Sequence, residues 1–165
     1  MKITVQMVLD RLIEPVGLLE QTVDTLKSGS LDAEVHKVAV VFMTTYVAIK
    51  QAVESGADLI ITHEPTYYNH MDEGEWLRGN PVYEKKRTLI EESGVSIFRL
   101  HDYVHEYEPD GILIGMLKKL EWVAYANPEE MNLLTPPSSE QHTVRTIVSH
   151  LKSKLGIDSM LVAGD

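Results

Sequence analysis

Two short stretches of the chain concentrate side chains that commonly bind metal ions and transfer protons. The first reads "HEP" at 63–65, and the second reads "HDYVHE" at 101–106. Imidazole and carboxylate groups suit divalent Zn, Mn, Fe and Ni, and thiolate ligands are excluded because the chain has no cysteine. Four of the seven histidines fall in the two loops that begin at these stretches, namely His63, His70, His101 and His105.

The spacing of these residues allows several side chains to reach one ion. His101 and His105 would share one face in a helix, and they would also share one face in an extended segment. We therefore expect metal ligands at His63, Glu64, His101 and His105, with His70 orienting one of them. The alternative is that each is an ordinary hydrogen-bonded residue of a polar surface loop.

The elements that position these stretches predict a layered α/β domain. Apolar runs predict strands at 35–43, 57–62 and 95–100, and the runs at 35–43 and 57–62 are expected to be buried on both faces. Helices alternate with these strands, which implies a mostly parallel or mixed sheet in an α/β/α arrangement. Ligands bind beyond the carboxyl ends of such strands, where both His-containing stretches begin. Helical spacing predicts helices at 4–12, 44–56, 79–94, 111–122 and 143–156.

Capping residues mark several element boundaries. Asn80 caps the helix at 79–94, Pro81 takes its first position and Gly94 stops it. Lys27-Ser28-Gly29 is interpreted as a turn in an irregular loop, and the run at 157–165 is interpreted as a strand. Asp24 could either cap a turn or supply a carboxylate to the metal pocket. We expect one domain over 1–165 that lacks a C-terminal segment.

Composition excludes several classes of function. With 15 basic and 25 acidic residues, the net charge of -10 argues against binding to a nucleic-acid backbone. No segment approaches the length of a membrane span, and the N-terminus lacks the pattern of a signal peptide, so a cytoplasmic protein is expected. No glycine-rich phosphate loop or nucleophile elbow is present, so no standard nucleotide-binding loop is predicted.

The order and spacing of these motifs resemble a known family. "AIKQAVESGADLIITHEPTYY" followed by "GVSIFRLHDYVHEYEPDGI" resembles the Nif-three-like dinuclear metal-centre family, whose members often carry the name GTP cyclohydrolase I type 2 homologs. The likeness covers roughly 35–115 well and extends more loosely to "TVDTLKSG". It implies a Nif-three-like fold, two divalent metal ions and a toroidal hexamer.

The chain departs from the family pattern at two ligand positions. By resemblance, His63 matches the first histidine of the family's "THHP", and Glu64 replaces the second. His101 matches the first residue of "HTNLD", and His105 replaces its final aspartate. These two replacements leave the identity of the metal open. The family completes its site with a distant C-terminal His and Glu that have no match here.

Three hypotheses about function follow. The first is a divalent-metal-dependent hydrolase of unknown substrate, in which two ions would activate a bound water. The second is a non-catalytic metal-binding scaffold or regulatory interaction protein. The third is an interaction domain whose histidines only decorate its surface. A small-molecule substrate and self-association are the expected partnerships, with neither nucleic acid nor membrane involved.

Overall fold

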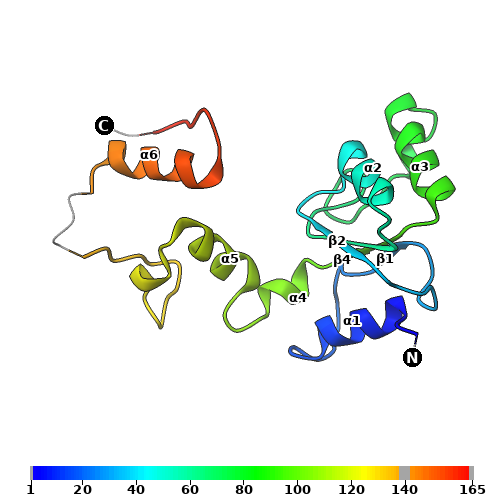
Figure 1. Ribbon diagram of the computed structural model, residues 1–165, viewed down its shortest axis with the longest axis horizontal. Helices are drawn as coiled ribbons and strands as arrows, with labels where there is room; N and C mark the ends of the chain where they lie inside the picture. Colours follow the sequence, from blue (N-terminus) through cyan, green and yellow to red (C-terminus); the bar gives the residue numbers. More distant parts are fainter. Residues whose placement is uncertain (1, 138–141, 164–165) are drawn as a thin grey trace. The chain divides into compact units, whose positions relative to one another are not determined.

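A computed structural model describes residues 2–137 and 142–163, which form two compact units, Met1–Tyr107 and Glu108–Asp165 (Figure 1). The first unit contains the sheet and both His-containing stretches. The second unit is helical. Because two compact units can belong to one cooperatively folding domain, the single domain expected over 1–165 stays a prediction.

The first unit is built on a mixed four-stranded sheet in the order β1-β4-β3-β2. The two central strands lie parallel, and β2 also runs parallel to β3, whereas β1 runs antiparallel to β4. Thr62 of β3 and Arg99 of β4 are register partners, so these two strands end at the same edge of the sheet. The strands are β1 (Leu26–Ser28), β2 (Val38–Val41), β3 (Leu59–Thr62) and β4 (Ser96–Arg99).

The helices of this unit begin and end close to where their capping residues predict. Thr45 and Asn80 cap α2 and α3 through side-chain oxygens that accept amide hydrogens of the first turn, and Gly94 ends α3 in the left-handed conformation. Thr4 caps α1 in the same way. The helices are α1 (Val5–Ile13), α2 (Tyr46–Glu54), α3 (Pro81–Ser93) and α4 (Asp102–His105).

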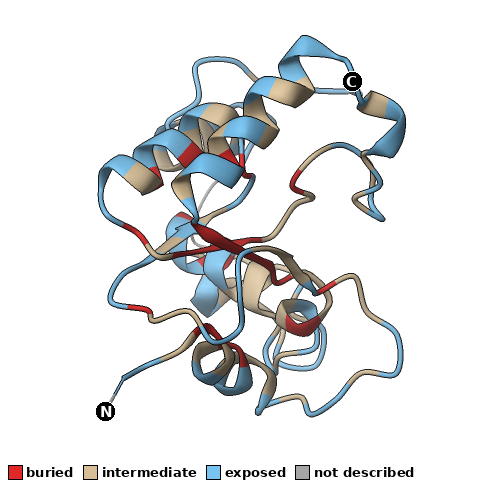
Figure 2. Cartoon of the chain, turned by 90° about the vertical axis from the view of Figure 1, so that its right-hand side faces the viewer, coloured by how far each residue is buried: buried red, intermediate tan, exposed pale blue. Residues whose placement is uncertain are grey.

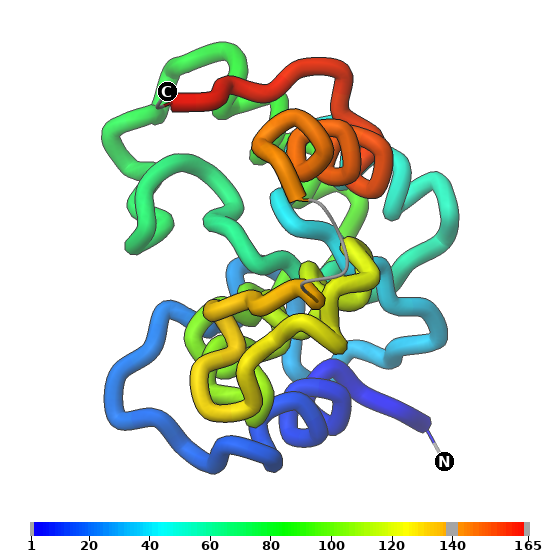
Figure 3. Tube along the Cα trace, turned by 90° about the vertical axis from the view of Figure 1, so that its left-hand side faces the viewer, coloured from blue at the N-terminus to red at the C-terminus, as the bar shows by residue number. Residues whose placement is uncertain are grey.

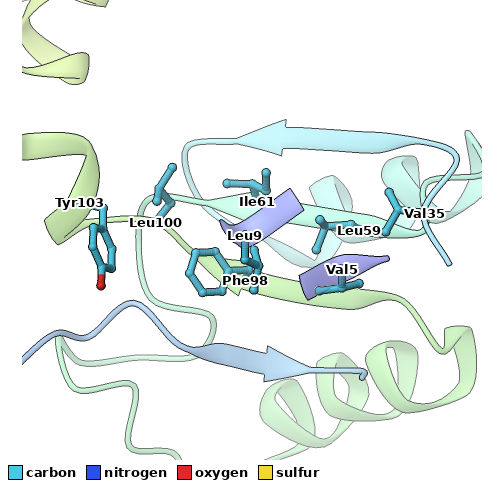
Figure 4. Packing of buried hydrophobic residues seen from close by; sticks show 8 residues of the cluster. All are labelled: Val5, Leu9, Val35, Leu59, Ile61, Phe98, Leu100 and Tyr103. Atoms are coloured by element: carbon cyan, nitrogen blue, oxygen red, sulfur yellow. The ribbon is translucent and has the colours of Figure 1, made fainter. Parts of the chain in front are cut away.

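Helices cover both faces of the sheet, which confirms the layered α/β/α class (Figure 1). On one face, Val5 and Leu9 of α1 pack against alternate strand residues such as Leu59 and Phe98 (Figure 4). On the other face, α2 and α3 pack against the intervening positions, including Ile60 and Ile97. All four residues of β3 and of β4 are buried, so the sheet core lies along these central strands (Figure 2).

The expectation that the run at 35–43 is buried on both faces is wrong. β2 is an edge strand, and Val40 is 78% exposed although Ala39 and Val41 pack beneath α2 and α3. Val38 and Val40 face the side of the sheet that carries α1, but that short helix packs over β3 and β4 instead. An apolar run therefore marks this strand correctly without showing which of its faces is covered.

The interpretation of Lys27-Ser28-Gly29 as a turn needs a similar correction. Leu26–Ser28 forms β1, which pairs with β4 at the other edge of the sheet. Only Gly29 has a turn-like backbone, with φ of +90°. A three-residue strand with no apolar alternation is hard to predict because its hydrogen bonds depend on a partner about 70 residues away.

The second unit contains α5 (Gly111–Leu120), a 3-10 turn (Val123–Tyr125) and α6 (Val144–Leu155). Thr143 caps α6 as predicted, and Thr146 completes a capping box. The strand expected at 157–165 is absent over 157–163, a segment that Figure 3 follows in red beyond α6, and 164–165 lie outside the described residues. No helix in the described part of the chain is long and apolar enough to cross a membrane.

Candidate metal centre

His63 follows directly on β3 and is held there by its neighbours. The amide of Glu64 donates to the Phe42 carbonyl at 2.8 Å, so the pairing with the β2 side of the sheet continues past the end of the strand. The Phe42 ring stacks on the imidazole of His63, with centroids 5.2 Å apart. These contacts place His63 partly buried at the carboxyl edge of the sheet.

His101 caps the single turn of α4, and His105 is the last residue of that turn. The turn is helical, so the first of the two geometries allowed by their spacing is the one adopted. The imidazole centroids of His101 and His105 lie 5.2 Å apart. Because β4 lies beside β3, this turn begins next to His63.

The three histidines converge on one point. Each offers one ligand nitrogen, and these nitrogens all lie within 4.8 Å of one another. Nitrogens bound to one tetrahedral zinc at about 2.0–2.1 Å are about 3.4 Å apart, so a small inward movement would bring all three onto one ion. The structure therefore groups His63, His101 and His105, three of the four ligands predicted from the sequence.

Glu64 is not a member of this three-residue group. It is partly buried, and its charge opposes the lowering of the His63 pKa that burial causes, which places it near the group without making it a member. Its role as a ligand stays a prediction. Three nitrogens from one cluster suit zinc, iron or nickel.

A model of the Duf34/NIF3 (NGG1p interacting factor 3) family matches residues 8–165 of this chain. The chain belongs to the Duf34/NIF3 family. The resemblance drawn from the "THEP" and "HDYVHE" stretches is thereby confirmed. No curated protein sequence matches the chain.

Several solved structures share the architecture of this chain. The chain is similar to Staphylococcus aureus hypothetical protein SA1388, with 21% identity and a TM-score of 0.58 over 73% of this chain and 34% of that one. Reduced HcgD from Methanocaldococcus jannaschii shows 15% identity and a TM-score of 0.58, over 93% of this chain and 60% of that one. TTHA1606 from Thermus thermophilus shows 14% identity and a TM-score of 0.60, over 91% and 59%. The chain thus spans about a third of the length of SA1388.

Hydrogen-bond partners at Nδ1 orient two of the three clustered histidines in this NIF3 family member. Nδ1 of His63 lies 3.3 Å from the Leu100 carbonyl oxygen, and Nδ1 of His101 lies 3.1 Å from a carboxylate oxygen of Asp102. A proton on Nδ1 satisfies both acceptors and leaves Nε2 of each ring with a lone pair for a metal. Partners of this kind accompany most metal-binding histidines.

The lowered pKa of His63 also favours metal binding. Burial lowers the pKa of His63 below its usual value of 6.5, and the nearby His101 and His105 lower it further, against the raising effects of the Leu100 carbonyl and Glu64. A neutral imidazole is the form that binds metals. Burial, together with the neighbouring His101 and His105, thus disfavours protonation of His63 and leaves its nitrogen available.

Asp24 acts as a cap, which decides between the two roles left open for it. Its carboxylate is buried and accepts the amide hydrogens of His101 and Asp102 at 2.7 and 3.1 Å and that of Tyr103 at 3.0 Å. These amides lie at the N-terminal end of α4, whose partial positive charge favours a carboxylate. Asp24 therefore fixes the turn that carries His101 and His105 and adds no ligand to their cluster.

Asp102 connects the same turn to the loop before β1. Its carboxylate accepts hydrogen bonds from the Thr22 hydroxyl and the Val23 amide, both at 2.8 Å. Partial burial raises the pKa of Asp102, but hydrogen bonds from Val23, Thr22 and His101 outweigh it and hold that pKa below its usual value. Asp102 is ionised at neutral pH and can keep His101 in its Nδ1–H tautomer.

Arg99 and His70 lie next to the histidine cluster. Arg99 was not among the site residues predicted from the sequence. Arg99 is fully buried at the end of β4, where its Nε donates to the His63 carbonyl at 3.2 Å and its Nη1 donates to the His70 carbonyl. The ring of His70 meets that of His101 edge-on, with centroids 5.2 Å apart. A charged residue inside the apolar run "VSIFRL" is the signal that could have identified Arg99.

Proposed function

We propose that this chain binds a divalent metal ion through His63, His101 and His105. The observation that carries the proposal is the convergence of their three ligand nitrogens within 4.8 Å at the carboxyl edge of the sheet. The Nδ1 partners of His63 and His101 support it, because they leave Nε2 of each ring for an ion. Three protein ligands leave a coordination position open, which is typical of catalytic rather than structural sites.

The finer proposal is a dinuclear, metal-dependent hydrolase that works as a homo-oligomer on a small molecule in the cytoplasm. A bound ion would supply Lewis acidity and lower the pKa of water. Glu64 follows His63 in the chain and is the candidate ligand for a second ion. His105 is exposed, so a substrate would have access to the cluster from solvent on that side.

A non-catalytic metal-binding scaffold is the second candidate. The family description names an interacting factor, which fits a protein that binds partners rather than substrates. Both candidates require the same metal site, and they differ only in turnover. A screen of phosphoester, cyclic amidine and amide substrates with metal-loaded protein separates them, because a scaffold would give no turnover.

The decisive experiment is elemental analysis of untagged protein together with anomalous scattering at the absorption edge of the metal found. We expect at least one equivalent of divalent metal, and we expect His63→Ala and His105→Ala each to lose it. His36→Ala is the matched control, since His36 is exposed and pairs with Glu34 and Asp58 away from the cluster. Metal-free protein whose properties are indifferent to His63→Ala would exclude both candidates.

A further inference from the structure

A second candidate site lies in the first unit, in the groove between the loop that follows "HEP" and the start of α3. The groove has a volume of about 750 Å³, within the range of small-molecule sites. None of its lining residues belongs to the histidine cluster. The lining residues are Tyr46, Tyr67, Tyr68, Leu77, Asn80, Pro81, Val82, Tyr83, Lys85 and Lys86.

Aromatic rings supply much of the wall. Tyr67 and Tyr83 pack with centroids 4.9 Å apart, and burial raises the pKa of Tyr67 to about 12, so its hydroxyl stays neutral. Tyr68 is 67% exposed and is braced edge-on by Trp76 at 5.0 Å. A largely exposed ring held in place by another ring is suited to stack on a flat ligand, because little side-chain entropy remains to be lost.

The charges of the groove are all positive. Lys85 lies over the ring of Tyr46 at 5.0 Å, and Lys86 lies over the ring of Tyr67 at 5.6 Å. Among the residues that the structure describes, no acidic residue lines the groove, although the whole chain has a net charge of -10. The nearby carboxylate of Asp72 is buried and accepts the amide hydrogens of Thr66 and Tyr67.

The two lysines have different roles. Lys86 is partly buried, and its ammonium donates to the Thr66 carbonyl, so it ties α3 to the loop. Lys85 is exposed, and its ammonium lies over the ring of Tyr46. Lys85 is therefore the more accessible of the two lysines to an anion, and the cation–π contact restrains its ammonium beside the Tyr46 ring.

We propose that this groove binds a planar aromatic anion, with the ring stacked on the tyrosine wall and the anionic group at Lys85. The tyrosines provide flat apolar surface for a ring, and the lysines provide a counter-charge that no lining acid cancels. An apolar ligand would leave the lysines unused, and a bare inorganic anion would leave most of the aromatic wall uncovered. The inference does not depend on metal binding at the histidines.

Adenosine monophosphate, adenosine and inorganic phosphate test the proposal by calorimetric titration of the full chain, with and without EDTA. The monophosphate combines ring and charge, so we expect it to bind about tenfold or more tighter than either fragment. Lys85→Met should weaken monophosphate binding about tenfold and leave adenosine unchanged. Tyr68→Ser should weaken both the monophosphate and adenosine about fivefold or more, because both use the ring.

Lys50→Met is the matched control, since Lys50 is an exposed lysine of α2 that pairs with Glu54 and does not line the groove. Both test residues are exposed, so the variants should fold as the parent does. The proposal is overturned if the monophosphate binds no tighter than adenosine, or does not bind at all. It is also overturned if Lys50→Met matches Lys85→Met, or if EDTA abolishes binding, which would place the phosphate on a metal.

Discussion

The imidazole rings of His63 and His101 lie nearly parallel, with centroids 4.5 Å apart and 12° between their planes. The two residues follow neighbouring parallel strands, and the register of β3 and β4 brings the strand ends together. His105 meets both rings at steep angles from the far end of α4. The sheet and one helical turn thus define the candidate metal centre.

Asp102 should tune the affinity of this centre for metal without binding the ion itself. We expect Asp102→Asn to weaken metal binding about 10–100-fold, because the carboxylate no longer holds the Nδ1 proton of His101. A chelator competition titration measures the change. Glu106→Gln is the control, since it removes the same charge from an exposed position at the end of α4. Equal effects of the two variants would show that only net charge matters.

Asp24 should support both stability and metal binding. Asp24→Ala leaves three amide hydrogens of the α4 turn without their acceptor, so we expect a loss of about 2–4 kcal/mol in the free energy of unfolding. Urea denaturation measures this loss, and Asp24→Asn should be intermediate because one acceptor oxygen remains. Asp32→Ala, at an exposed position, should be nearly neutral. A small effect of Asp24→Ala would contradict the role of this cap.

Gly29 should tolerate no side chain. A Cβ at this position would lie 2.2 Å from Oγ and 2.7 Å from Cα of Ser96 in β4, and the φ of +90° is unfavourable for other residues. We expect Gly29→Ala to cost about 2–4 kcal/mol in the free energy of unfolding. Gly56→Ala has a similar φ of +78° but open space around it, so it should cost about 1 kcal/mol. Denaturation midpoints of the two variants should therefore differ clearly.

His63 should make stability depend on pH in the metal-free protein. Because its native pKa lies below the usual 6.5, the unfolded state binds more protons between these two values. Its contribution to stability is therefore complete above about pH 6.5 and is lost as the pH falls through the native pKa. Urea denaturation at about pH 7.5 and about pH 5.5 tests this. His63→Gln should flatten the dependence, and an unchanged slope in that variant would contradict the assignment.

Local signals in the sequence were sufficient for most of the helices. Asn80, Pro81 and Gly94 delimit α3 as predicted, because a cap, a first-turn proline and a left-handed glycine act within a few residues of one another. The strands β3 and β4 were also predicted. β3 is buried on both faces and reads as a continuous apolar run, whereas β4 was recognised from its run at 95–100 although Ser96 and Arg99 interrupt its apolar residues.

Predictions failed where a partner far along the chain was needed. β1 depends on β4 for its hydrogen bonds, and the exposure of Val40 depends on which strands α1 covers. The short run at 157–163 has strand-like residues but forms no strand in the described chain. Residue type alone carries no information about such distant contacts.

The sequence by itself determined that His63, His101 and His105 stand just beyond strand ends, because strand and helix signals are local. Only the tertiary structure decided that the three rings converge, that Asp24 is a cap, and that the buried Arg99 donates a hydrogen bond to the His63 carbonyl. The physical reason is that a ligand geometry depends on distances between separate segments. Those distances are set by sheet register and by buried hydrogen bonds that form only when the chain has folded.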